Sequence, residues 1–272
     1  MLPFGELFGL VSPATRAAVL REGERLSDAW GAHLYVAPTQ GASPADLDQL
    51  VQWCRERREG EEGGASRDAS EETRGGEGLV VAGQPEARTA VPPLDDPFLR
   101  EHLKHGTQSM FVVHPGTTPD TIQHILVPTD FSAAAVESVH CALGLASIYN
   151  ARVVLLHVVE ESPYIALTRR DRLSMGPAAL PQYRARRRLQ QCIRAQGAQE
   201  VPVDRQIRLG AAAEQIGEAA GQEDIDLLVL AARGAGAVDG AALGSVAERV
   251  LQRVSGPLFL HRTSHGQHAP SN

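Results

Sequence analysis

The residues best suited to chemistry lie in two short segments of the second half of the chain. In Pro128-Thr129-Asp130, an apolar run ends in a carboxylate that is suited to accept hydrogen bonds from a ribose or a base. The other segment is glycine-rich, and nine residues separate Gly234 from Gly244-Ser245. A glycine-rich loop leading into a helix offers unpaired backbone N–H groups and the positive end of the helix dipole. Together these favour a phosphate group.

Alternating strands and helices must position these two segments. Apolar runs of strand-forming residues begin at His124 and Arg152 and recur over residues 201–210, 225–232 and 257–262. Between these runs, apolar residues recur at helical spacing, which predicts helices over residues 133–149, 182–196, 211–224 and 244–254. Ser132 or Asp130 is the predicted N-cap of the first helix, and Asn150 closes it. This order predicts an α/β fold with helices on both faces of an open parallel sheet, whose ligands bind beyond the carboxyl ends of the strands.

The first half repeats this pattern in a shorter form. Residues 7–13, 14–30 and 33–38 resemble the first strand, helix and strand of the second half, and residues 78–83 and 109–115 resemble its last two strands. A counterpart of the strand at 201–210 is missing. We therefore predict two tandem domains over residues 1–120 and 121–264, the first one shortened, and a loose tail over residues 265–272.

Residues 55–78 stand where the missing strand would be. They contain eight acids, five arginines and six glycines. Such a composition cannot bury enough apolar surface to offset the entropy lost on ordering. We expect a mobile surface loop here, and an acidic docking segment is the alternative.

Composition and charge exclude several classes of function. The 272-residue chain has a formal net charge of −7 at pH 7, which argues against nucleic-acid binding. No apolar stretch approaches the roughly 18–20 residues that span a bilayer, and the N-terminus does not resemble a signal peptide, so we expect a cytoplasmic protein that contacts no membrane. Lys104 is the only lysine and no G-x-x-x-x-G-K-[ST] loop occurs, which excludes a Walker A site.

The cysteines and histidines have simple structural interpretations. Three widely separated cysteines fit neither a disulfide framework nor a metal knuckle, and we expect unreactive thiols at Cys54, Cys141 and Cys192. His157 should make a structural hydrogen bond rather than act as a general base, because no nucleophile or second acid accompanies it. No acid or cysteine lies near the three histidines at 261, 265 and 268, so we predict no metal site there.

The arginines fall into two groups with different expectations. Four of them, at 184, 186, 187 and 188, should form a solvated helix face, and an anion or partner site is the alternative. Arg233, in the glycine-rich loop, is the side chain best placed to meet a phosphate.

Four segments in the second half, VPTDFS, LLHV, IDLLVLAARG and GSVAERVL, resemble the universal stress protein family in their sequence and order, and the first half does so more faintly. The resemblance implies two tandem Rossmann-like (HUP-type) domains. Members of this family that bind ATP carry G-x2-G-x9-G-[ST]. Gly234, Gly244 and Ser245 fit that motif, but Ala231 replaces its first glycine. A positive φ would strain alanine there, whereas a negative φ would leave only the small effect of an added methyl group.

The resemblance implies a site for ATP, or for AMP or ADP, in the second domain. Mg²⁺ is an optional companion, held by water and the nucleotide. The adenine and ribose would lie among Asp130, Val158, Leu230 and Ala231, and the phosphates against the glycine loop. The predicted nucleotide-binding residues are Pro128, Thr129, Asp130, Val158, Leu230, Ala231, Arg233, Gly234, Gly244, Ser245 and Val246.

The predicted function is a stress response through nucleotide-dependent binding or signalling, because no base, nucleophile or lysine accompanies the phosphate loop. A slow ATPase, in which Asp130 orients a water, and a ligand-free scaffold are the alternatives. The first domain should bind no nucleotide, since the counterpart of Asp130 falls at Val11, Ser12 or Pro13. Single-domain relatives pair through their last strands, so a tandem chain should place residues 257–262 beside 109–115. The whole chain could in addition form a homodimer, an alternative that the sequence does not decide.

Overall fold

The computed structural model describes residues 4–11, 16–30, 32–38, 77–83, 97–105, 108–113, 121–160, 181–196, 201–222, 224–235 and 243–263. Within these ranges the strands are β1 (Phe4–Val11), β2 (His33–Pro38), β3 (Glu77–Gly83), β4 (Ser109–Val113), β5 (His124–Pro128), β6 (Arg152–Val159), β7 (Val203–Leu209), β8 (Leu227–Ala231) and β9 (Leu258–His261). The helices are α1 (Arg16–Trp30), α3 (Pro97–His105), α4 (Ala133–Tyr149), α6 (Pro181–Ala195), α7 (Ala212–Ala220) and α8 (Ser245–Leu251).

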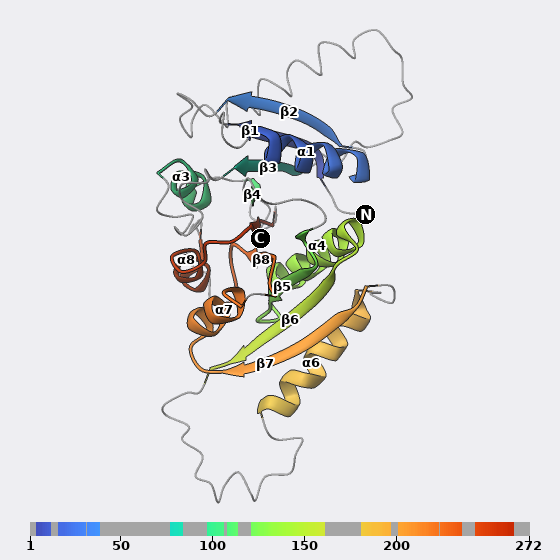
Figure 1. Ribbon diagram of the computed structural model, residues 1–272. Coiled ribbons are helices and arrows are strands. Elements are labelled where there is room, and N and C mark those ends of the chain that lie inside the picture. Colours follow the sequence, from blue (N-terminus) through green and yellow to red (C-terminus); the bar gives the residue numbers. More distant parts are fainter. Residues whose placement is uncertain are drawn as a thin grey trace, which may run out of the picture.

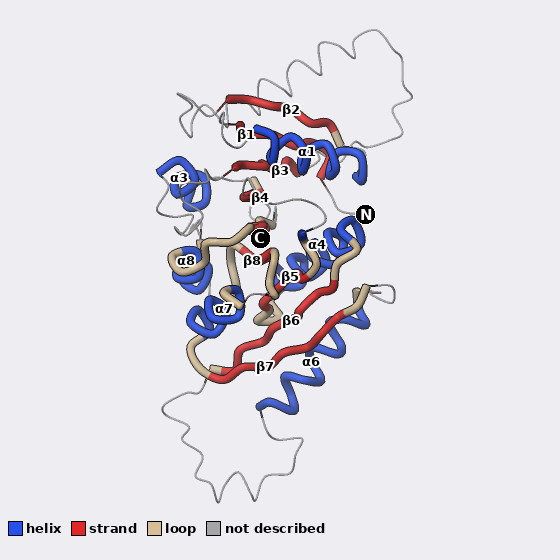
Figure 2. Tube along the Cα trace, in the orientation of Figure 1, coloured by secondary structure: helices blue, strands red, loops and turns tan. Residues whose placement is uncertain are grey.

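The described strands form one open mixed sheet of nine strands, in the order β2-β1-β3-β4-β9-β8-β5-β6-β7 (Figure 1). Helices cover both faces of the sheet, as the alternation of elements predicts (Figure 2). Successive residues of the buried strands face opposite sides. Leu79 and Val81 belong to the core on the side of α1, α4 and α6, whereas Val80 and Ala82 belong to the core on the side of α3, α7 and α8. The α/β fold class is therefore confirmed.

The two halves of the chain meet at the centre of the sheet. All neighbouring strands are parallel except β4 and β9, which pair antiparallel with Phe111 opposite Phe259. The rings of these two residues lie 5.9 Å apart between centroids. The predicted pairing of the last strands of the two halves is therefore confirmed. In the described part of the first half, the order β2-β1-β3-β4 matches β6-β5-β8-β9 and has no counterpart of β7.

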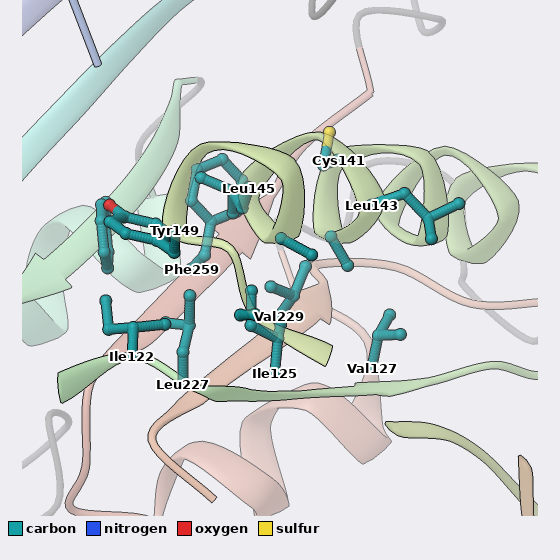
Figure 3. Packing of buried hydrophobic residues seen from close by; sticks show 14 of the residues in the cluster. Ile122, Ile125, Val127, Cys141, Leu143, Leu145, Tyr149, Leu227, Val229 and Phe259 are labelled. Atoms are coloured by element: carbon teal, nitrogen blue, oxygen red, sulfur yellow. The ribbon is translucent and has the colours of Figure 1, made fainter. Parts of the chain in front are cut away.

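Helix α4 shows how local sequence defines an element. Ser132 is its N-cap, and the Ser132 hydroxyl oxygen accepts a hydrogen bond from the backbone N–H of Ala135 at 3.2 Å. Asn150 ends the helix in the left-handed conformation, with φ 53°. Between these caps, Leu145 and Tyr149 belong to the same buried cluster as Ile125, Val229 and Phe259 of the sheet (Figure 3).

Several element ends differ from the sequence-based expectations. Helix α7 ends at Ala220, because Gly221 caps it, and α8 ends at Leu251 rather than at residue 254. Strand β3 begins at Glu77, inside the predicted mobile loop, because Glu77 and Gly78 pair with β1. The rest of that loop and the predicted tail at 265–272 lie outside the described residues. The division into domains at residue 120 stays a prediction. None of the described helices has the length and apolar character needed to cross a membrane.

One buried polar contact joins the first half to α4. The Tyr149 hydroxyl donates a 2.8 Å hydrogen bond to Glu22 Oε2, and Glu22 on α1 has no exposed surface. The other oxygen, Oε1, has no hydrogen-bond partner. Burial raises the pKa of Glu22 above its ordinary value of 4.5, against the opposing effects of the Tyr149 bond and of Arg25 and Arg21.

Candidate functional site

A cavity of about 180 Å³ opens beyond the carboxyl ends of β5, β6 and β8. The alternating order of elements places it there, because each of these strands passes into the loop before a helix at the same edge. All eleven predicted site residues line it: Pro128, Thr129, Asp130, Val158, Leu230, Ala231, Arg233, Gly234, Gly244, Ser245 and Val246. The structure thus brings together segments that are more than a hundred residues apart.

Asp130 ties two of these loops to each other. Its Oδ1 accepts a hydrogen bond from the backbone N–H of Ser132 at 2.9 Å, and its Oδ2 accepts one from the backbone N–H of Ala235 at 2.7 Å. Partial burial raises the pKa of Asp130, but hydrogen bonds from the Ser132 hydroxyl and the Ala235 amide outweigh it and leave the pKa below its usual range. The side chain is therefore an anion that fixes the start of the glycine loop.

Phe131 holds the backbone beside Asp130 in a rare conformation. Its φ is 65°, in the left-handed region that residues other than glycine seldom adopt. The Phe131 N–H donates to the Thr129 hydroxyl oxygen at 3.0 Å, and its ring lies 4.6 Å from that of His157. The guanidinium of Arg188 lies over the Phe131 ring, 4.2 Å from its centroid. The packing of the ring and the hydrogen bond of the backbone thus hold this turn in its strained conformation.

His157 makes the structural hydrogen bond that the sequence predicts. Its Nδ1 lies 2.7 Å from the Thr129 carbonyl oxygen, and the side chain is half-buried at the wall of the cavity. The Thr129 backbone N–H donates in turn to the Leu156 carbonyl at 2.8 Å. The strand ends of β5 and β6 are therefore locked to each other below the loop that carries Asp130.

The three motif positions in the glycine loop differ in what they require. A Cβ atom at Gly234 would lie 2.6 Å from Asp130 Oδ2, so this glycine is needed for close approach. A Cβ at Gly244 would meet only ordinary contacts, the nearest at 3.5 Å to the Ala232 carbonyl. Ala231 ends strand β8 and does not have a positive φ. The alanine that replaces the first motif glycine is therefore unstrained.

The end of the cavity nearest α8 is polar and positively charged. Gly244 is the N-cap of this helix, and its N–H donates to the Ala232 carbonyl at 2.8 Å. The N–H groups of the first turn, which begins at Ser245, have no acceptor within a helix. Arg233 is exposed beside them. Burial and the charge of Arg233 lower the pKa of Arg262 to about 10, although the Arg262 side chain binds the Leu103 carbonyl and is not part of the cavity lining.

The predicted nucleotide-binding residues omit six that line the same cavity, of which only His157 is singled out from the sequence, for its structural hydrogen bond: Ala135, Leu156, His157, Ala212, Ile216 and Ala247. Ala212 and Ile216 come from α7, whose N-terminus lies at the same edge of the sheet. The rule that ligands bind at the carboxyl ends of strands points to the loop after β7 and hence to this helix. Nothing local in the sequence indicates that the Ala235 amide meets Asp130.

The remaining candidates behave as structural residues where they are described. Cys141 and Cys192 are buried free thiols, and burial raises the pKa of Cys192. His261 lies within β9 with 3% of its surface exposed, and burial lowers its pKa to about 4. Cys54, His265 and His268 lie outside the described residues. Among the described residues no cluster of three potential metal ligands occurs.

The open α/β sheet with a glycine loop beyond its strand ends defines a Rossmann-like protein. The sequence profile of the universal stress protein family matches residues 121–262, and the chain belongs to this family. A universal stress protein of Methanocaldococcus jannaschii is 27% identical over 138 residues, which cover 50% of this chain and 79% of the relative.

Two solved structures extend the likeness to the first half of the chain. The match to a universal-stress-type protein from Pseudomonas aeruginosa covers 95% of this chain and 93% of that protein. Its TM-score is 0.62 and the sequence identity is 15%. A universal stress protein from Archaeoglobus fulgidus has a TM-score of 0.54 at 16% identity, with 94% of this chain and 96% of that one covered. At these identities the likeness concerns the fold.

Proposed function

We propose that the cavity beside Asp130 binds ATP or a related adenine nucleotide, and that the protein acts in a stress response through this binding. The observation that carries the proposal is the convergence of both predicted segments on one cavity. A carboxylate, an apolar wall and a loop rich in N–H groups are the three surfaces that a nucleotide requires.

Each part of the ligand has a counterpart in the cavity. Val158, Leu230 and Ile216 offer apolar surface for the adenine. Asp130 lies where a ribose hydroxyl would donate to the lone pairs that its two backbone hydrogen bonds leave free. The loop at Gly234 and the turn at Ser245, with Arg233, would hold the phosphates. Mg²⁺, when present, would be bound by phosphate oxygens and water.

The proposed role is binding rather than turnover. Among the described residues that line the cavity, Asp130 has the one carboxylate, and both of its oxygens already accept backbone N–H groups. His157 is engaged through Nδ1 with a backbone carbonyl. A nucleotide held in this way would set the conformation of the glycine loop and so signal its own presence.

The nucleotide content of the protein purified under mild conditions, followed by titration with labelled ATP, ADP and AMP, tests the proposal. Ala231→Val, which adds bulk to the cavity wall, should weaken binding about tenfold or more, whereas Ala231→Gly should bind at least as tightly as the parent chain. Thermal unfolding without nucleotide is the control for both variants. A folded sample that binds none of the three nucleotides at millimolar concentration would contradict the proposal, and release of phosphate that Asp130→Ala abolishes would favour a slow ATPase.

A further inference from the structure

Helix α6 has an arginine-rich surface that the proposed nucleotide site does not use. Its fifteen residues, Pro181–Ala195, contain five arginines and no acidic residue. All five are exposed, and no ion pair involves them within the described ranges: Arg184, Arg186, Arg187, Arg188 and Arg194. The helix packs at the outer end of the sheet, against β6 and the edge strand β7 (Figure 1).

Three of the arginines lie along the solvent-exposed side of the helix. Ala185, Leu189 and Cys192 are buried against the sheet. Arg187 and Arg194 are seven residues apart and lie on the side opposite the buried face, whereas Arg184 lies at the flank of that side. The three span about 15 Å along the helix axis. Tyr183 lies four residues before Arg187 on the same side, with 44% of its surface exposed.

Arg188 is distinct from these three arginines because it is already engaged. Its guanidinium lies over the ring of Phe131, beside the nucleotide cavity. Arg184, Arg187 and Arg194, together with Tyr183, are referred to below as the α6 stripe. Changes within the stripe can therefore be made without touching the cavity.

The charge pattern of the stripe differs from that of an ordinary solvated helix. Exposed helices usually mix both signs, because like charges three or four residues apart repel each other. The chain has 33 acidic residues against 26 basic ones, so acids are not scarce. Yet α6 contains no acidic residue, and Arg184 lies three and four residues from Arg187 and Arg188. The positive charges of these side chains therefore repel one another, and carboxylates docked beside them would relieve the repulsion.

We propose that the α6 stripe docks an acidic segment of a partner protein. Guanidinium groups bind carboxylates through two parallel hydrogen bonds, and each arginine of the stripe is exposed and forms no ion pair with the residues that the structure describes. Tyr183 adds an exposed aromatic surface, and tyrosine with arginine is the composition typical of binding hot spots. A stripe of this length fits a short extended or helical peptide.

Membranes and nucleic acids fit this surface less well. A helix that binds a lipid surface buries its apolar face among the headgroups, but the apolar face of α6 is already buried against the sheet. A long polyanion would also meet the rest of a chain whose net charge is −7, whereas a short acidic peptide contacts the stripe alone.

Fluorescence anisotropy with the full chain tests the proposal. The probe is a labelled short peptide of glutamates and aspartates around one leucine, and its glutamine and asparagine analogue is the control probe. We expect the acidic peptide to bind, and Arg184→Glu with Arg187→Glu to weaken it at least about tenfold. Raising NaCl from about 0.05 to 0.3 M should weaken it similarly. The same charge change at Arg249→Glu with Arg253→Glu, in α8 and the turn that follows it, should have little effect.

Other outcomes would overturn the proposal. These are equal binding of the acidic peptide and its amide analogue, equal binding by the stripe variant and the parent chain, or no binding by the parent chain. The proposal also fails if vesicles containing phosphatidylglycerol, or single-stranded DNA, bind through Arg184 and Arg187 while the peptide does not. If the glutamate variant does not fold, Arg184→Gln with Arg187→Gln replaces it. Nucleotide binding, measured on the same samples, is independent of the result.

Discussion

Asp130 and Gly234 approach each other so closely that a side chain at position 234 would collide with the carboxylate. The carboxylate joins the turn after β5 to the glycine loop after β8 through the Ala235 N–H, at 2.7 Å. The absence of a Cβ at Gly234 makes room for it, because a methyl group there would lie 2.6 Å from Oδ2. At the residue scale, the glycine motif is thus in part a packing requirement of the protein.

Gly234→Ala should displace the Asp130 carboxylate and break its bond to Ala235. We expect a loss of about 1 kcal/mol in the free energy of unfolding, since the bond is charge-assisted but exposed to water. Gly256→Ala is the matched control, because a Cβ at this exposed position would meet no other part of the protein within 4 Å. Urea unfolding of both variants measures the difference. Equal stability of the two would mean that the carboxylate moves aside without loss.

Phe131 offers a test of stored backbone strain. Its φ of 65° favours glycine over any other residue. Phe131→Gly and Phe131→Ala both remove the ring from His157 and Arg188, but only glycine relieves the strain. We therefore expect the glycine variant to be the more stable of the two by about 1 kcal/mol, the reverse of the usual order. Thermal unfolding of the pair measures this, with Ala134→Gly in α4 as the control for the ordinary preference.

The sequence locates the cavity but not these contacts. Asp130, Gly234 and Ser245 could be found because strand ends and glycine spacing are local patterns. The bond between Asp130 and Ala235 joins residues 105 apart in the chain, and no local pattern encodes it. The left-handed turn at Phe131 is likewise set by the packing of His157 and Arg188 around its ring.

At the element scale, the contact between α1 and α4 depends on a buried carboxyl group. Tyr149 supplies one hydrogen bond to Glu22, and the second oxygen has none. Helical periodicity predicts both helices, but it does not show that Glu22 faces inward. The ends of α7 and α8 were also predicted too long, because helical periodicity continues beyond the point where Gly221 and Gln252 cap the backbone.

The stability of this helix contact should fall as the pH rises. Burial raises the pKa of Glu22, so the folded chain keeps a proton that the unfolded chain has lost above pH 4.5. The stabilisation by the protonated group is complete below pH 4.5 and is lost as the pH rises through the pKa of the folded state. Glu22→Gln cannot titrate and should remove this decline. Urea unfolding between pH 4 and 8 measures it.

Glu24→Gln is the matched control for this experiment, because Glu24 is exposed on the same helix. It should leave the pH profile of the parent chain unchanged. Parallel profiles for Glu22→Gln and the parent chain would show that Glu22 titrates in the folded state as it does in the unfolded one.

At the scale of the whole molecule, one antiparallel strand pair unites two half-sheets. Strand β9 is buried along its length, and β4 covers its outer edge with Met110, Phe111 and Val112 opposite Leu260, Phe259 and Leu258. The sequence predicts this pairing from the repeated strand pattern and the family resemblance. It leaves the antiparallel direction open, because direction depends on how the two halves rotate relative to each other.

A fragment of residues 121–272 should therefore self-associate. Without β4, the edge of β9 exposes unpaired backbone groups between apolar side chains, which is a template for pairing with another strand. A second copy can supply β9 in the antiparallel direction and form a two-fold dimer. Light scattering after gel filtration should give twice the fragment mass, and added residues 1–120 should convert the dimer to a complex of one copy of each fragment. A fragment that remains a monomer at micromolar concentration would show that β4 is not needed to cover this edge.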